Sequence, residues 1–142
     1  MDIAESSAHM RISSSDIETV ASSHRGFVRE NNEDRYYVQR LGADAMLLAV
    51  VDGMGGGPMG MAAAETMREA LTEYPVAAQD PEKALYDLVV AASETIRGLV
   101  RNNPALEGMG TTVTATLIAN GRAHWVHVGD TRFYVLRGGR LI

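Results

Sequence analysis

The sequence has no cysteine in 142 residues, no long apolar run and no cluster of basic residues. The missing thiols exclude disulfides, thiolate zinc sites, iron–sulfur clusters and cysteine nucleophiles. Lys and Arg number 13 against 18 Asp and Glu, a formal net charge of −5, which argues against nucleic acid or an anionic membrane as the main partner. Because no segment resembles a signal peptide or reaches membrane-spanning length, the sequence predicts a cytoplasmic domain.

The composition is that of one globular domain. Apolar residues make up 46% of the chain and charged residues 22%, and a chain of this length can bury a core without covalent crosslinks. Residues 1–16 are polar and rich in serine, so we expect a disordered tail or an expression remnant there. The ordered part is expected to cover residues 17–142.

Strand-like and helix-like patterns occur in separate blocks. One helix is expected over residues 58–74, and a second begins at Pro81 with Asp80 as its cap. Asn120-Gly121 is typical of a two-residue hairpin turn. The expected strands cover residues 17–21, 36–41, 46–51, 111–119, 122–128 and 131–136. Strands, two helices and further strands in this order favour an α+β fold over alternating βαβ units.

Asp52 is the first candidate site residue, because it ends the apolar run 46–51 and precedes a glycine-rich loop. A carboxylate there lies at the rim of the core, and Gly53 has no side chain to keep its carbonyl from a ligand. Carboxylate, carbonyl and water oxygens are the ligands that Mg²⁺ and Mn²⁺ prefer. Taken alone, this pattern fits a turn carboxylate that accepts loop N–H groups somewhat better.

Three further segments carry candidate charges. Glu33 and Asp34 are adjacent carboxylates, whose mutual repulsion favours a bound cation if both face one site. Arg29 offers a planar fork that suits a phosphate oxygen. Asp130 follows an apolar stretch and Gly129. Taken singly, a solvated loop with a surface ion pair and a turn acid explain these residues better.

Residues 55–60 match the G-x-G-x-x-G pattern of dinucleotide-binding loops, between an expected strand and an expected helix. Pro58 removes an N–H that a pyrophosphate could use, and Asp80, twenty residues further on, is better explained as a helix cap. A dinucleotide-binding module is therefore a minor alternative. His124 and His127 lie three residues apart in an expected strand, so they point to opposite faces and cannot share one metal.

Four segments taken together are more specific than any one of them. They are residues 25–34 (RGFVRENNED), 48–56 (LAVVDGMGG), 108–112 (GMGTT) and 126–132 (VHVGDTR). In amino-acid sequence and in order they resemble the motifs of the bacterial branch of the metal-dependent serine/threonine protein phosphatases, the PP2C or PPM family. The resemblance covers the chain after residue 16.

The resemblance implies a β-sandwich flanked by helices on both sides, with two Mn²⁺ or Mg²⁺ ions at one end of the sheets. Asp52 would bridge the two ions, and Gly53 would offer its carbonyl. Asp130 would help to bind a third, weaker ion.

The resemblance also implies a reaction, the hydrolysis of phosphoserine and phosphothreonine in a protein substrate by a metal-activated water. Glu33 and Asp34 would hold metal-bound water, directly or through a neighbouring group. Arg29 would bind the substrate phosphate. Such a mechanism needs no covalent nucleophile, so the absence of cysteine is no obstacle.

The family pattern continues beyond Ile142 with a Ser-Asp-Gly segment and a final Asp-Asn, which supply further metal ligands. The resemblance therefore implies an N-terminal portion of the domain, apparently incomplete at its C-terminus. Fewer ligands mean weaker binding of hard cations. The alternative is a catalytically inactive PP2C-like fragment that binds a partner or self-associates through uncovered sheet edges.

Overall fold

The computed structural model describes residues 7–13 and 17–142. Strand β1 (Ser7–Ser13) pairs antiparallel with β2 (Glu18–His24) over seven register pairs. Residues 7–13 are therefore a strand where the sequence predicts a disordered tail, while residues 1–6 and 14–16 lie outside the described residues. The alternation of Ala8, Met10 and Ile12 with polar residues is typical of a strand, but it is easily overlooked in a serine-rich segment.

The central sheet contains four antiparallel strands in the order β3-β4-β5-β6. The strands are β3 (Asp34–Arg40), β4 (Ala45–Met54), β5 (Gly110–Ala119) and β6 (Arg122–Val128). Asn120 and Gly121 join β5 to β6 with positive φ angles of 52° and 70°, which confirms the expected hairpin turn. The register sets Asp34 opposite Asp52, and Asp52 opposite Thr112.

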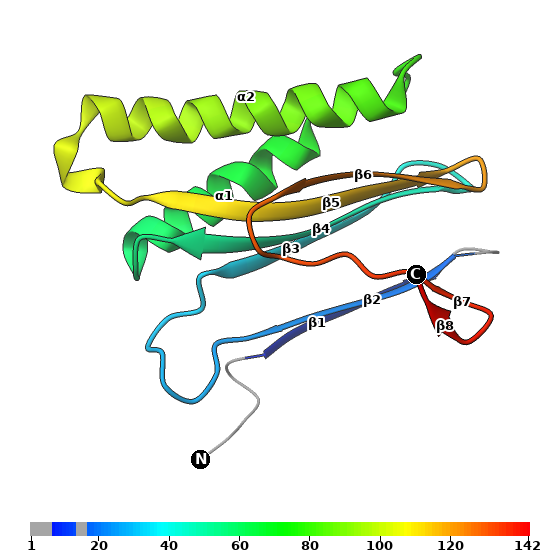
Figure 1. The fold of residues 1–142 in the computed structure, drawn as a ribbon, viewed down its shortest axis with the longest axis horizontal. Helices are drawn as coiled ribbons and strands as arrows, with labels where there is room; N and C mark the ends of the chain where they lie inside the picture. Colours follow the sequence, from blue (N-terminus) through cyan, green and yellow to red (C-terminus); the bar gives the residue numbers. More distant parts are fainter. Residues whose placement is uncertain (1–6, 14–16) are drawn as a thin grey trace.

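Two helices, α1 (Pro58–Thr72) and α2 (Pro81–Asn102), cover one face of this sheet (Figure 1). The Asp80 side chain caps α2 by accepting a hydrogen bond from the Lys83 N–H. A short 3₁₀ helix, η2 (Pro104–Leu106), leads back to β5. The buried core between helices and sheet includes Leu47, Val51, Val113, Ala115, Leu117, Ala63, Met67, Leu71, Leu85 and Val89.

The opposite face of the sheet is covered by the β1–β2 hairpin and by the segment after β6 (Figure 1). Two β layers thus face each other, as expected for a sandwich. The resemblance implies helices on both sides, whereas the described residues place α1 and α2 on one side only (Figure 1). The expected strand 131–136 is wrong. In residues 129–142 the only strand pairing is between β7 (Leu136–Arg137) and β8 (Arg140–Leu141), and a strand needs a paired neighbour.

The helices of the described residues lack the combined length and apolar character of a membrane span. None in residues 7–13 and 17–142 is both long enough and apolar enough to cross a bilayer. α2, at 22 residues, is long enough but carries charged residues along its length.

Candidate active site

Asp34 and Asp52 form a facing pair of carboxylates at one end of the sheet. They are cross-strand partners on β3 and β4, and partners in an antiparallel pair point to the same face with Cβ atoms roughly 4.5–5.5 Å apart. Burial raises the pKa of Asp52 most, and the charge of Asp34, a hydrogen bond with Asp34 and the charge of Asp130 raise it further. Like charges held this close favour either a shared proton or a bound cation.

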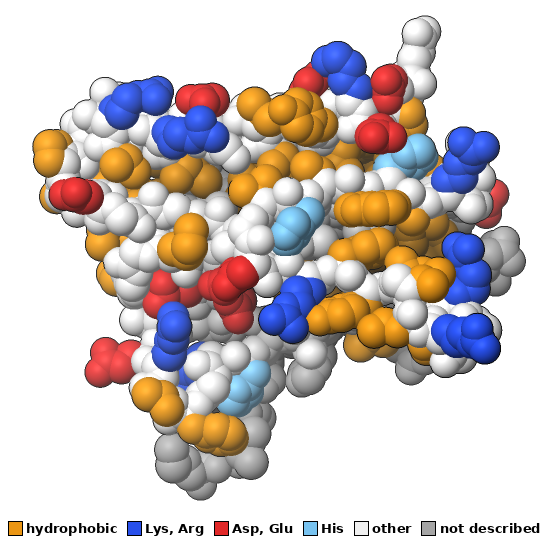
Figure 2. Space-filling view, in the orientation of Figure 1, with side chains coloured by type: hydrophobic (Ala, Val, Ile, Leu, Met, Phe, Trp, Pro, Cys, Tyr) orange, Lys and Arg blue, Asp and Glu red, His pale blue; other side chains and the backbone are white. Residues whose placement is uncertain are grey.

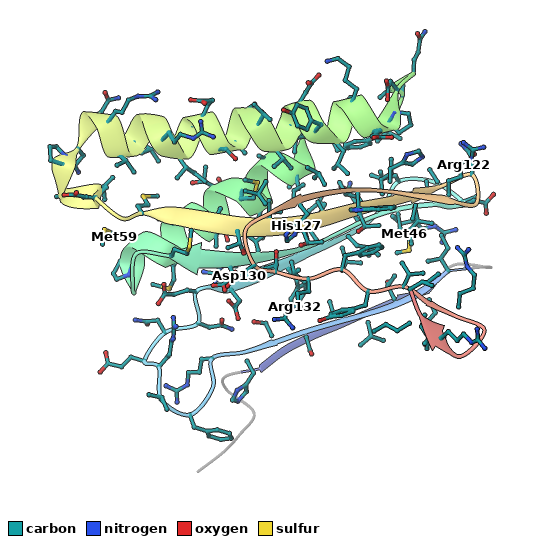
Figure 3. All side chains as sticks on the ribbon, viewed as in Figure 1. Met46, Met59, Arg122, His127, Asp130 and Arg132 are labelled. Atoms are coloured by element: carbon teal, nitrogen blue, oxygen red, sulfur yellow. The ribbon has the colours of Figure 1, made fainter. Side chains whose placement is uncertain are left out.

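Two more predicted residues lie near this pair. The negative charge of Asp130 raises the pKa of Asp52, and the positive charge of Arg29 lowers it, so both charges act on the same carboxyl group. Figure 2 shows a group of acidic side chains near the middle of the face in view, with basic side chains close by, and further acidic side chains scattered elsewhere. Asp130 lies where the chain leaves β6, on the face that carries the pair (Figure 3).

Glu33 does not join the pair, although it is adjacent to Asp34 in the sequence. Its side chain is buried, and Oε1 accepts hydrogen bonds from the Gly57 N–H at 3.0 Å and from Arg29 Nη1 at 3.4 Å. Gly57 is the cap of α1, so the carboxylate lies at the positive end of a helix dipole, where a negative charge is favourable. Glu33 thereby links Arg29 to the start of α1.

Gly53 is required by a close contact between β4 and α1. A Cβ atom built on Gly53 would lie 2.0 Å from the backbone oxygen of Gly60. The Gly53 N–H donates to the backbone oxygen of Glu33 at 3.3 Å. Glycine at this position is therefore explained by packing, in addition to the carbonyl access that the sequence suggests.

Asp34, Asp52 and Thr131 are among the residues that line a cleft of about 290 Å³. Their oxygen atoms are of the kind that Mg²⁺ and Mn²⁺ prefer, and the repulsion within the pair favours a cation. Across residues 7–13 and 17–142, no three side chains of His, Cys, Asp or Glu converge closely enough to hold an ion. The donors fit a divalent cation in kind, and they are fewer than the roughly six or more oxygen ligands that such a cation takes.

Sequence reasoning overlooks a row of threonines on β5. Thr111 Oγ1 donates to the backbone oxygen of Asp52 at 2.8 Å, and Thr112 is the cross-strand partner of Asp52. Thr114 Oγ1 lies within hydrogen-bond distance of both His127 Nδ1 and Thr131 Oγ1. The period-two recurrence of threonine in residues 112–116 is the signal that could have found them.

The loop at residues 55–60 shows no free cradle for a dinucleotide. Pro58 begins α1, and the Gly57 N–H that a phosphate would need already donates to Glu33. The described sheet is antiparallel throughout, whereas a dinucleotide fingerprint belongs to a parallel βαβ unit.

Comparison with known proteins agrees with this geometry. The family model described as protein phosphatase 2C matches residues 23–141. The chain belongs to the protein phosphatase 2C family. It is 43% identical over 128 residues to the serine/threonine protein phosphatase PstP of Mycobacterium tuberculosis, covering 85% of this chain and 23% of PstP. It is 33% identical over 125 residues to the protein phosphatase PhpP of Streptococcus pneumoniae, covering 80% of this chain and 48% of PhpP.

Solved structures of the family share the fold. The catalytic domain of PstP in complex with two manganese ions matches with a TM-score of 0.74 and 38% identity, covering 96% of this chain and 54% of that one. PppA of Pseudomonas aeruginosa matches with a TM-score of 0.72 and 28% identity, covering 97% of this chain and 55% of that one. This phosphatase 2C chain spans about half or less of the length of these relatives.

Proposed function

We propose that the chain carries the N-terminal part of the active site of a metal-dependent protein serine/threonine phosphatase. The facing carboxylates of Asp34 and Asp52 carry this proposal, because two such groups in one cleft are electrostatically suited to divalent cations. Asp52 and the Gly53 carbonyl would help to hold two Mn²⁺ or Mg²⁺ ions, and Asp130 would help to hold a third, more weakly bound ion.

Each residue has a distinct role in this proposal. Bound metal ions supply an acidified water and neutralise phosphoryl oxygens. Asp34 would orient water through its carboxylate oxygens. Glu33 would assist it through a neighbouring group. Arg29 would bind the substrate phosphate: its side chain is 67% exposed and is held at one nitrogen by Glu33, so the rest of its planar fork is open to an anion. A metal-activated water would need no covalent nucleophile from the protein.

The proposed substrates are proteins that carry phosphoserine or phosphothreonine. Relatives that are named serine/threonine phosphatases or protein phosphatases support this substrate class. An exposed loop, residues 25–32, carries Arg29, so the phosphate-binding fork is accessible to a bulky substrate. The sequence-based expectation of a cytoplasmic protein stays a prediction.

The test is hydrolysis of a phosphothreonine peptide and of p-nitrophenyl phosphate, with and without Mn²⁺. We expect turnover that requires Mn²⁺, that Asp52→Asn abolishes and that Arg29→Ala lowers mainly through a higher KM. Asp44→Asn is the matched control, because Asp44 is an exposed acid in the loop between β3 and β4. Turnover that survives Asp52→Asn, or that needs no metal, contradicts the proposal.

A second candidate function is self-association without catalysis. An open groove of about 1060 Å³ lies beside β6, where the Trp125 and Phe133 rings stack at 5.3 Å. Trp125 is 55% exposed, and exposed aromatic patches of this kind mark interaction sites. Sedimentation velocity over a range of concentrations tests it: a dimer that Trp125→Ser dissociates supports this function, and a monomer at every concentration contradicts it.

A further inference from the structure

Three threonines of β5 share the sheet face that carries the carboxylate pair. Thr112, Thr114 and Thr116 alternate along the strand and are 3%, 4% and 6% exposed. Alternate residues of a strand point to the same face, and Thr112 is the cross-strand partner of Asp52. The row of threonines therefore begins beside the candidate active site and continues away from it.

The first threonine contacts the residue before Asp130. A Cβ atom built on Gly129 would lie 2.5 Å from Thr112 Cγ2 and 2.6 Å from its Cβ. Gly129 also has a φ of 101°, in the region that favours glycine. The backbone of Gly129 is thus in close contact with Thr112, and this contact leaves no space for a side chain at residue 129.

The second threonine holds the residue after Asp130. Thr114 Oγ1 lies 2.8 Å from Thr131 Oγ1 and 2.9 Å from His127 Nδ1. A threonine hydroxyl has one proton and can also accept. Thr114 can therefore donate to one partner and accept from the other, and this forms a chain of hydrogen bonds from β6 through β5 to the segment after Asp130. His127 and Asp130 lie close together along this part of the chain (Figure 3).

We propose that Thr112, Thr114 and His127 are positioning residues that hold Asp130 beside Asp52. Thr112 holds the preceding residue by contact, and Thr114, with His127 behind it, holds the following residue by a hydrogen bond. Asp130 is itself exposed, and its charge acts on Asp52. Without these two attachments, an exposed segment with few buried contacts would sample many positions.

This inference rests on the proposed function only for the role of Asp130 as a metal ligand. Thr116 offers the matched control: it is the same residue type on the same face of the same strand, buried to a similar extent, and it has no hydrogen bond to residues 129–131 among those recorded for the described residues. If Thr114 only stabilised the pairing of β5 with β6 through His127, its loss would lower stability without loosening residues 129–131 more than the loss of Thr116 does.

The experiment compares Thr114→Val, Thr116→Val and Thr114→Ser in the full chain. Valine keeps the shape of threonine and removes the hydroxyl, and serine keeps the hydroxyl. For the metal-free chain we expect ¹⁵N order parameters at residues 129–131 to fall from about 0.85 to below about 0.6 in Thr114→Val alone. The urea midpoints of both valine variants are measured to confirm that each variant is folded.

The second readout is the Mn²⁺ concentration that gives half-maximal hydrolysis of p-nitrophenyl phosphate. Thr114→Val should raise it about fivefold, the value of one typical hydrogen bond, while Thr116→Val and Thr114→Ser stay near the parent chain. Equal order parameters and equal Mn²⁺ dependence in the two valine variants overturn the inference. If the parent chain shows no turnover, the proposed function fails, and the order parameters still decide the positioning role.

Discussion

The two faces of the central sheet differ in how completely they are packed. On β4, Leu47 and Val51 point to the helices and are 0% and 1% exposed, whereas Val50 points the other way and is 47% exposed. The helix-facing side is a closed core. The opposite side is packed unevenly: Met46 and the threonine row are buried there, but Val50 is exposed, and the carboxylate pair and open grooves lie on the same side. Packing on one face fixes the strands, so the other can hold groups that repel each other.

The electrostatics follow the same division. Buried apolar side chains on the helix face stabilise the fold, since apolar burial contributes about 25 cal/mol per Å². On the other face, burial and neighbouring negative charges raise the pKa of Asp52, which means that its ionised form destabilises the folded chain. The site is thus kept at a cost that the helix-facing core offsets.

The largest expected effect comes from the packed face. Leu71 on α1 is fully buried, so Leu71→Ala should lower the free energy of unfolding by about 2–5 kcal/mol, through lost burial and a cavity. Val50→Ala, on the open face, should cost about 0.5 kcal/mol or less, in the range of surface substitutions. Urea denaturation of both variants checks the pair, and equal losses would contradict the contrast between faces.

A smaller loss is expected where the packed face meets the site. Gly53→Ala places a methyl group against the Gly60 carbonyl, and overpacking of this kind typically costs about 1–3 kcal/mol. Gly98→Ala is the control, because a Cβ atom on that helical glycine would meet only Arg101 Nη2, at an ordinary contact distance of 3.9 Å, and it should stabilise the chain by about 0.5–1 kcal/mol. A Gly53→Ala variant as stable as the parent in thermal unfolding would show that β4 and α1 are not in close contact.

The helix layer depends on the start of α2. Asp80→Ala removes the acceptor of the Lys83 N–H and should lower the free energy of unfolding by about 1 kcal/mol. Asp44→Ala, in an exposed loop, provides the comparison and should change little. Chemical denaturation at neutral pH measures both, and the interpretation of Asp80 as a cap is wrong if the two variants behave alike.

The smallest effect is expected on the open face and depends on pH. Because the pKa of Asp52 is raised in the folded chain above its ordinary value of 3.8, its charge opposes folding at pH 7. Asp52→Asn should therefore raise the urea midpoint slightly in metal-free buffer at pH 7. The gain should shrink as the pH falls through the folded-state pKa and vanish below about pH 3.8. If Asp52→Asn were instead less stable than the parent chain at pH 7, the charge of Asp52 would favour folding, contrary to this prediction.

Local signals predicted the elements that depend on few residues. The Asp80 cap and the Asn120-Gly121 turn occur as expected, because each depends on the backbone preference of one or two residues. The strand expected at residues 131–136 is absent up to Val135, because a strand depends on a distant partner that local sequence does not reveal.

The candidate site was predicted less completely than the fold. Asp34 and Asp52 face each other, in keeping with their proposed place in one site. The side chain of Glu33 instead points to the start of α1, and this depends on the direction in which the chain enters β3. The role inferred for Thr114 depends on a contact with Thr131 across 17 residues. Neither pattern is visible without the register of the strands.

The most direct test of the central claim is the effect of Mn²⁺ on the NMR spectrum of the full chain, because paramagnetic broadening detects even weak binding. We predict that substoichiometric Mn²⁺ first broadens the amide signals around Asp34, Asp52 and Asp130, and that Asp52→Asn removes this selectivity. Broadening centred instead on the exposed acids at the start of α2, or unchanged by Asp52→Asn, would contradict the assignment of the carboxylate pair as a metal site.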